Sequence, residues 1–400
     1  MKKILILNDG SNYENWGIKA CIDGLLKILN SGDVNFIIEG LPHSYMHRKY
    51  SFEPSIFKKK FFNENSRISK KFFNEFHELP DVADEFDFVA DMWIKGNGGI
   101  GASHFIKKMN DIDILIFNGE GSTYRKNIGA VKGLFMLWFA KTRLNKKAYF
   151  LNGSVTLTRV DAVLPAMISK TFSIIDGISV REPYSKENIK SYCPSLDDIS
   201  VIPDSVFSIN PENKKSVDIK SKSDSKITDY FCFSLSMLPI DFKRSYSNSS
   251  LVKLIEGLKD VVPNVVLLAK DVEDQALREL SNDTNAFYIG SNYNYHEVMT
   301  ILNSSKFLLS GRYHHLIFAS KVGCPCIPLM SSSHKIHGLS KLFDGIMPNP
   351  YDPTNIFVEY DGIVQCAKNI VYDEKIRKKY IEKSNILKTE CINGIQNLIS

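Results

Sequence analysis

Along almost the whole chain, short apolar runs alternate with segments whose apolar residues recur at helical spacing, and this alternation constrains the fold more than any other feature. The clearest buried strand is expected at Ile112–Phe117 (IDILIF), and an apolar stripe at Asn15–Leu29 predicts a helix. A second alternating series begins at Tyr230 and ends at Leu329. Strands that alternate with helices form a parallel sheet covered on both faces. The sequence therefore predicts an α/β protein with two doubly wound, Rossmann-like domains that face a cleft.

Changes in composition divide the chain into parts. We expect an N-terminal Rossmann-like domain at residues 1–209, a linker at 210–228, a C-terminal Rossmann-like domain at 229–350 and a helical segment at 351–400. The linker is rich in lysine and serine and poor in apolar residues, which is typical of exposed connections. Ligands of doubly wound sheets bind beyond the carboxyl ends of the strands, so the site is expected where the two domains face each other.

The segment 42–110 interrupts the first domain and fits the alternating pattern poorly. It contains a near-repeat, KKFFNE, at residues 59–64 and 70–75. The surrounding stretch, residues 57–76, predicts an amphipathic helical insertion whose phenylalanine face packs on the domain. The alternative is a basic, aromatic surface that meets a membrane-held lipid acceptor. The glycine-rich residues 96–101 follow no convincing strand, and we expect a flexible loop there.

The charge balance and the cysteines limit the partners and the compartment. With 50 Lys and Arg against 45 Asp and Glu, the formal charge of +5 is too small to indicate nucleic-acid binding, although it suits an anionic small molecule or an anionic membrane surface. The seven scattered cysteines predict buried thiols in a reducing cytoplasm. No apolar run approaches the roughly 18 residues of a membrane-spanning helix. We therefore expect a cytoplasmic protein, with peripheral contact at the inner face of the membrane left open.

The stretch SGRYHHLIFA at Ser310–Ala319 places cationic side chains where a buried strand gives way to a helix. A helix N-terminus attracts anions through its free amides and its dipole. Arg312 adds a guanidinium at the same point, a combination suited to a phosphate or a carboxylate. His314 or His315 can serve as a general acid because histidine titrates near neutral pH, although a buried core histidine is the alternative for each.

Polar loops follow several strands of the first domain. The loop Asn8–Gly17 is polar and glycine-bearing and could hold a sugar or a phosphate, but it lacks the GxGxxG pattern of dinucleotide sites. Glu120 lies between two glycines after the strand Ile112–Phe117, where it could act as a base or bind a hydroxyl, unless the segment is only a tight turn. Arg181 and Asp204 follow two further strands. Because parallel strands end at one edge of a sheet, these side chains are expected together.

These motifs resemble those of a known family, the polysaccharide pyruvyl transferases. They occur in order over about residues 4–345, and the most specific of them is Ser-x-Arg-x-His-x-x-Ile-x-Ala at 310–319, followed by Gly-x-Pro at 323–325. The matching elements are Asn15-Trp16-Gly17, FNGEGS at 117–122, ISVRE at 178–182, IPDSVF at 202–207, SGRYHHLIFA at 310–319 with Gly323-Cys-Pro325, and Lys335. The chain departs from the family pattern at Ile18, where aspartate is common, and at His315, where glycine is usual.

The resemblance implies a fold similar to the two-lobed GT-B glycosyltransferases. It also implies transfer of pyruvate from phosphoenolpyruvate (PEP) to two hydroxyls of a sugar, which forms a ketal on a surface polysaccharide or its lipid-linked precursor, without a metal or a cofactor. The implied catalytic residues are His314 as the acid, Arg312, and Glu120 as the base. The implied donor site comprises Ser310, Gly311, Arg312, His314, His315 and Lys335, and the implied acceptor site comprises Asn12, Asn15, Asn118, Arg181 and Asp204.

Two other functions fit the same residues. A GT-B glycosyltransferase that uses a nucleotide-activated sugar is the leading alternative, because a CMP-linked keto-acid sugar would present the same carboxylate and phosphate to Arg312 and His314. Fold alone does not decide between these donors. A sugar-polymer-binding protein on a degenerate transferase fold is the third interpretation, and the presence of Arg312 and His314 argues against it.

Overall fold

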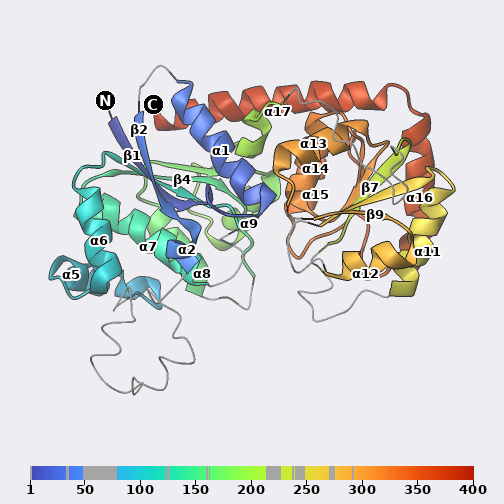
Figure 1. The fold of residues 1–400 in the computed structure, drawn as a ribbon. Coiled ribbons are helices and arrows are strands. Elements are labelled where there is room, and N and C mark those ends of the chain that lie inside the picture. The colour runs from blue at the N-terminus through green and yellow to red at the C-terminus, as the bar shows by residue number, and fades with distance from the viewer. Residues whose placement is uncertain are drawn as a thin grey trace.

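The computed structural model contains two parallel sheets with helices packed on them, and a long C-terminal helix runs along both lobes (Figure 1). This arrangement confirms the predicted α/β architecture of two doubly wound domains with a helical C-terminal segment. The structure describes residues 2–32, 36–47, 79–121, 123, 127–158, 161, 163–212, 227–236, 238, 248–269, 275–290 and 292–400. The segment 57–76 and most of the expected linker, residues 213–226, lie outside the described residues.

The first lobe is built on a six-stranded sheet in which every pair of neighbours is parallel. In sheet order, its strands are β2 (Phe36–Pro42), β1 (Lys2–Asp9), β3 (Ile114–Asn118), β4 (Lys147–Gly153), β5 (Gly177–Val180) and β6 (Ser200–Val201). Every residue of β3 is buried, as expected of a central strand with helices on both faces. The helices are α1 (Trp16–Asn30), α2 (His43–His47), η1 (Ala83–Glu85), α5 (Phe86–Ile94), α6 (Gly99–Met109), α7 (Ile128–Arg143), α8 (Val163–Phe172), α9 (Pro183–Tyr192) and η2 (Ser205–Ser208).

The second lobe repeats this plan on a five-stranded parallel sheet. In sheet order, its strands are β11 (Cys326–Pro328), β10 (Leu308–Ser310), β7 (Tyr230–Ser234), β8 (Asn264–Leu268) and β9 (Phe287–Ile289). Its helices are α11 (Asn248–Lys259), α12 (Gln275–Asp283), α13 (Tyr295–Ser304), α14 (Tyr313–Lys321) and α15 (Lys335–Leu342). The chain continues into α16 (Ile356–Tyr372) and α17 (Ile376–Ile399).

One hydrophobic cluster is shared by the two lobes. It contains Ile4 and Ile116 of the first sheet, Leu308 of the second, and Tyr380 and Ile395 of α17. The buried residues of α17 recur at helical spacing, so a single apolar stripe packs against both lobes. Helix α17 continues to Ile399 and returns to the first lobe, where Gln396 donates to the carbonyl of Ile28 at 3.4 Å.

The glycine-rich residues 96–101 are not the loop that the sequence predicted. Helix α6 begins at Gly99, and Gly96 and Gly99 both have positive φ, 78° and 85°. Only glycine adopts this conformation readily, so the two residues form a tight turn between α5 and α6. A Cβ atom at Gly98 would also collide with Trp93. The glycines therefore allow two helices to pack closely.

The cysteines are free thiols, as the sequence predicts. All seven cysteines are free, and each of them except Cys366 is buried. Within the part of the chain that the structure describes, no helix combines the length and the apolar character needed to cross a bilayer.

Candidate active site

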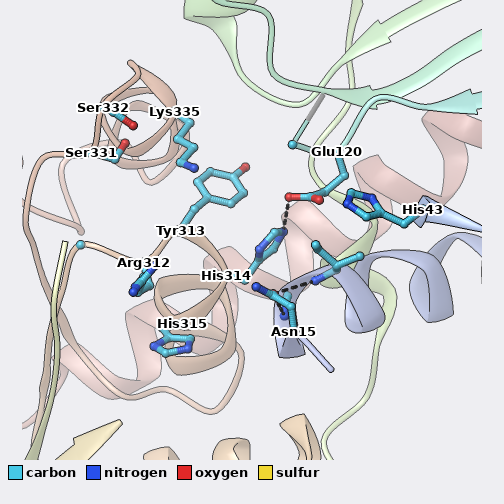
Figure 2. A pocket seen from close by; sticks show the side chains of 14 residues that line it. Asn15, His43, Glu120, Arg312, Tyr313, His314, His315, Ser331, Ser332 and Lys335 are labelled. Carbon is cyan, nitrogen blue, oxygen red and sulfur yellow. Dashed lines mark hydrogen bonds and ion pairs between the residues drawn. The ribbon is translucent and has the colours of Figure 1, made fainter. Parts of the chain in front are cut away.

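A cavity of about 290 Å³ lies between the two lobes, beyond the carboxyl ends of their strands. Its walls come from the loops after β1 and β3, the start of α2, the N-terminus of α14 and the segment that leads into α15 (Figure 2). The lining residues are Asn15, Gly17, Ile18, His43, Glu120, Gly121, Gly311, Arg312, Tyr313, His314, His315, Ser331, Ser332 and Lys335. This is the location that the strand-end rule for doubly wound sheets predicts.

His314 belongs to the second lobe, yet its imidazole contacts residues of the first lobe. Its Nε2 atom lies 3.6 Å from Oδ2 of Asp204, 4.0 Å from Oε1 of Glu120 and 3.4 Å from Nη1 of Arg181. Gly17 packs directly against the ring, and a Cβ atom at this position would overlap it. A proton on Nε2 is therefore directed toward carboxyl oxygens, and the position of the ring depends on contact between the lobes.

Arg181 holds this group of charges together although it is only 1% exposed. Its Nη1 atom lies 2.7 Å from Oδ2 of Asp204 and 3.9 Å from Oε1 of Glu120, and its Nε donates to Ser154 Oγ at 2.7 Å. The guanidinium also lies 4.3 Å from the centre of the Tyr313 ring, a cation–π contact. A buried charge is stable only when it is paired and hydrogen-bonded, and Arg181 meets both conditions.

The pKa values of Arg181 and Asp204 follow from these contacts. Burial alone would raise the pKa of Asp204, but the interactions with His314 and Arg181 outweigh it and lower the value to about 2. Burial opposes the charge on Arg181, but the neighbouring Tyr313, Asp204 and Glu120 raise its pKa above the ordinary value. The Arg181–Asp204 pair is therefore ionised at neutral pH. Burial also raises the pKa of Tyr313 well above its usual range, so its phenol is neutral.

Arg312 is the N-cap residue of α14 and lines the cavity beside the free amides of that helix. A chain of hydrogen bonds supports it: its backbone amide donates to Ser310 Oγ at 2.9 Å, and Ser310 Oγ lies 2.6 Å from Ser234 Oγ. Ser234 Oγ in turn lies 3.0 Å from Nδ1 of His315, whose ring is 1% exposed and packs against Trp16. His315 thus contributes a buried edge to the cavity, whereas His314 extends toward the first lobe.

The predicted site residues divide into those that line the cavity and those that support it. Asn15, Glu120, Gly311, Arg312, His314, His315 and Lys335 line the cavity. Four others do not: Asn118, Arg181, Asp204 and Ser310 are buried at 0–1% exposure behind the lining. Asn12 is exposed in the turn before α1 and is also absent from the lining. Of the expected acceptor-binding residues, only Asn15 faces the cavity, and its side chain caps α1 by accepting from the amides of Gly17 and Ile18.

Comparison with known proteins identifies the family. A family model described as polysaccharide pyruvyl transferase matches residues 20–333, which is most of the chain and includes Glu120, Arg312 and His314 of the cavity. The chain belongs to the polysaccharide pyruvyl transferase family. No curated protein matches the chain at a significant level.

Several solved structures are similar in fold to this pyruvyl transferase. A putative UDP-N-acetylglucosamine 2-epimerase from Listeria monocytogenes has a TM-score of 0.59 at 10% identity, with 100% of this chain and 96% of that chain covered. The Staphylococcus aureus MnaA–UDP co-structure has a TM-score of 0.55 at 12% identity, covering 100% and 97%. Phytolacca americana UGT2 complexed with UDP-2-fluoro-glucose and pterostilbene has a TM-score of 0.53 at 13% identity, covering 100% of both chains. At such low identity the likeness shows the GT-B fold alone.

Sequence reasoning on this pyruvyl transferase missed several residues of the lining, among them Tyr313, His43, Ser331 and Ser332. Tyr313 stands between the two residues that the motif singles out, and its side chain contacts Arg181. His43 starts α2 directly after β2, so the strand-end rule applied to β2 would have found it. Burial lowers the pKa of His43, and the nearby Glu120 only partly opposes this effect. The ring is therefore neutral at neutral pH.

Proposed function

We propose that this protein transfers pyruvate from PEP to two hydroxyls of a sugar in a surface polysaccharide or its lipid-linked precursor, and that the product is a ketal. The observation that carries the proposal is the position of His314. It comes from the second lobe, lies among Glu120, Arg181 and Asp204 of the first, and shares the cavity with Arg312 and Lys335. An acid beside fixed cations is the arrangement that protonation of PEP requires.

The donor side of the cavity has the chemistry that PEP needs. PEP carries a phosphate and a carboxylate, and the second lobe offers a guanidinium, an ammonium and the amides of a helix N-terminus. In the proposal, Arg312 binds one of the two anionic groups and Lys335 supports the other. The hydroxyls of Ser331 and Ser332, which line the same wall, add neutral hydrogen-bond partners.

The proposed reaction begins with proton transfer from His314 Nε2 to the methylene carbon of PEP, which leaves a cation at C2. A sugar hydroxyl adds to C2 and gives up its proton to Glu120. The C2–O bond to phosphate then breaks, and the second hydroxyl loses its proton as it adds to close the ketal. Of the two hydroxyl protons released, one replaces the proton that His314 donated and the other leaves on phosphate. Arg181 and Asp204 do not line the cavity, so we assign them the role of positioning His314.

A nucleotide-sugar donor is the alternative that the fold leaves open. UDP is named with two of the structural relatives, MnaA and UGT2, but at 12% and 13% identity these likenesses carry no information about the donor of this chain. The family match supports PEP, because the matched residues include Arg312 and His314 on one side of the cavity and Glu120 on the other.

Thermal-shift measurements with PEP, CMP, UDP and GDP test the donor directly. A ligand at 100 times its dissociation constant adds about 2.7 kcal/mol to the free energy of unfolding, which is readily measured. We expect a shift with PEP that Arg312→Ala abolishes. A shift with a nucleotide and none with PEP would overturn the proposal and make the protein a glycosyltransferase.

A further inference from the structure

A second histidine, His43, faces the same cavity from the first lobe. It is the first residue of α2, which follows β2 without a connecting loop, so the ring lies at the carboxyl end of that strand. The side chain is half-buried and lines the cavity together with Glu120 and His314. In Figure 2 the Glu120 carboxyl group is drawn between the rings of His314 and His43. Neither the family motifs nor the reaction outlined above assigns His43 a role.

The hydrogen bonds of Asn8 determine which nitrogen of His43 carries the proton. The Asn8 amide group donates to the carbonyls of Asn118 and Glu120, at 2.8 Å and 3.0 Å. Its Oδ1 atom therefore faces Nδ1 of His43, 2.6 Å away. Because an amide oxygen only accepts hydrogen bonds, the proton lies on Nδ1. In the neutral ring Nε2 then carries the lone pair that can accept a proton.

The short helix that carries His43 is held firmly. Lys132 is fully buried in α7, and its Nζ donates to the carbonyl of Tyr45 in α2 at 2.7 Å. The hydroxyl of Tyr45 donates to the carbonyl of Gly101 in α6 at 2.8 Å. A five-residue helix has little stability of its own, so these buried contacts fix the position of the ring.

The reaction outlined above assigns an acceptor to only one of the two hydroxyl protons that ketal formation releases. PEP and a diol give the ketal and inorganic phosphate. Two O–H bonds break, one proton ends on the methylene carbon and the other leaves on phosphate. Two hydroxyls must therefore be deprotonated in one turnover. Glu120 accounts for one of them, and a carboxyl group that has taken up a proton cannot accept another until it is discharged.

We propose that Nε2 of His43 accepts the proton of one of the two acceptor hydroxyls, so that His43 and Glu120 act as the two bases of a pyruvyl transfer that closes a ketal. This inference rests on the proposed function. It is supported by the fixed tautomer, the shared cavity and the anchored helix. The lowered pKa of His43 agrees with it, since a base must be unprotonated when the hydroxyl attacks.

The test uses the full-length enzyme and a panel of p-nitrophenyl hexosides that carry a free 4,6-diol, with phosphate release from PEP and ketal formation as readouts. His43→Gln should lower kcat by roughly a hundred-fold, since a general base contributes about 10²–10⁴-fold, while the KM for PEP stays unchanged. His104→Gln is the matched control, because His104 is an exposed histidine on α6 of the same lobe. It should behave as wild type.

A second variant separates catalysis from structure. In His43→Ala, added imidazole should restore part of the turnover, which a purely structural role would not permit. Wild-type activity in both His43 variants, or loss of activity that imidazole does not restore while the protein still melts cooperatively, would overturn the inference and leave the proposed function intact. If the wild-type enzyme releases no phosphate from PEP with any hexoside, the proposed function fails and this inference fails with it.

Discussion

The two walls of the cavity obtain their charged residues in different ways. The second lobe places Arg312 and His314 at one helix N-terminus, within three consecutive residues. The first lobe assembles Glu120, Arg181 and Asp204 from loops after three strands, and an ion pair buried beneath the lining joins two of them. One wall therefore depends on a single local motif and the other on the whole sheet. Substitutions at Arg312 and His314 of the second lobe should change the chemistry, whereas substitutions in the buried Arg181–Asp204 pair of the first lobe should mainly change stability.

The largest effect is expected for His314→Ala. Loss of the acid should lower turnover by about 10²–10⁴-fold, while cooperative melting remains, because the ring is held by contacts between the lobes and not by the core of either. Steady-state kinetics and calorimetry on the same preparation check this. A variant that no longer melts cooperatively would show that His314 is a structural residue and that the contrast between the walls is wrong.

Asp204→Asn should act mainly on stability. It keeps the shape of the side chain but leaves the buried Arg181 without its ion-pair partner at 2.7 Å, which typically costs about 3–5 kcal/mol. Urea denaturation measures the loss. Asp197→Asn is the control, since Asp197 pairs with Lys190 on the surface and such pairs contribute about 0–1 kcal/mol. Equal losses of stability in the two variants would contradict the structural role of the buried Arg181–Asp204 pair.

The carboxyl group of Asp204 also makes the stability of the protein depend on pH. The pKa of Asp204 is about 2 in the folded protein, against about 3.9 in an unfolded chain. Because the folded value is the lower one, the stabilisation is complete above about pH 4 and is lost as the pH falls toward 2. The wild type should lose stability over this range more steeply than Asp204→Asn, as measured by denaturation at several pH values.

Gly17→Ala tests the contact between the walls. The added methyl group would overlap the His314 ring, so the ring must move, and we expect turnover to fall about ten-fold, equivalent to about 1.4 kcal/mol of transition-state stabilisation. Gly32→Ala is a suitable control because its Cβ atom would meet only Gln396, at an ordinary 3.5 Å. Unchanged kinetics in Gly17→Ala would mean that the chemistry tolerates a displaced His314.

A further pH dependence is expected from Lys321, which joins the lobes away from the cavity. Its Nζ donates to the carbonyl of Phe207 at 2.5 Å, and burial, together with Lys388, lowers its pKa to about 7. In the unfolded chain the pKa of lysine is about 10.4, so between about pH 7 and about pH 10 the unfolded chain binds more protons than the folded protein. The free energy of unfolding should therefore rise as the pH increases from about 7 to about 10. Lys321→Met should reduce this rise. An identical pH profile in the variant would contradict the assignment.

The comparison of the walls also explains what the sequence could reveal. Arg312 and His314 were predictable because strand, turn and helix follow one another within about ten residues. Arg181 and Asp204 were placed at the correct strand ends, but their burial was not predicted. Periodicity does not distinguish a charge that faces a ligand from one that pairs inside the protein.

Other differences between the structure and the sequence-based expectations concern single residues and the packing of distant segments. Asn12 belongs to the same loop as Asn15, but only Asn15 turns toward the cavity, because it caps α1. His43 was missed because no polar loop separates β2, which ends at Pro42, from α2, which begins at His43. The length of α17 depends on contacts with both lobes, which no local pattern shows.

The return of α17 to the first lobe has a consequence for biosynthesis. Cys391, Ile395 and Ile399 are buried in the cluster that also covers Ile4 and Leu25 of the first lobe. On the ribosome, that lobe must wait for the whole second lobe to be made before its exposed apolar face is covered (Figure 1). We therefore expect the nascent first lobe to expose this apolar face until α17 is made, and α17 to complete the cores of both lobes.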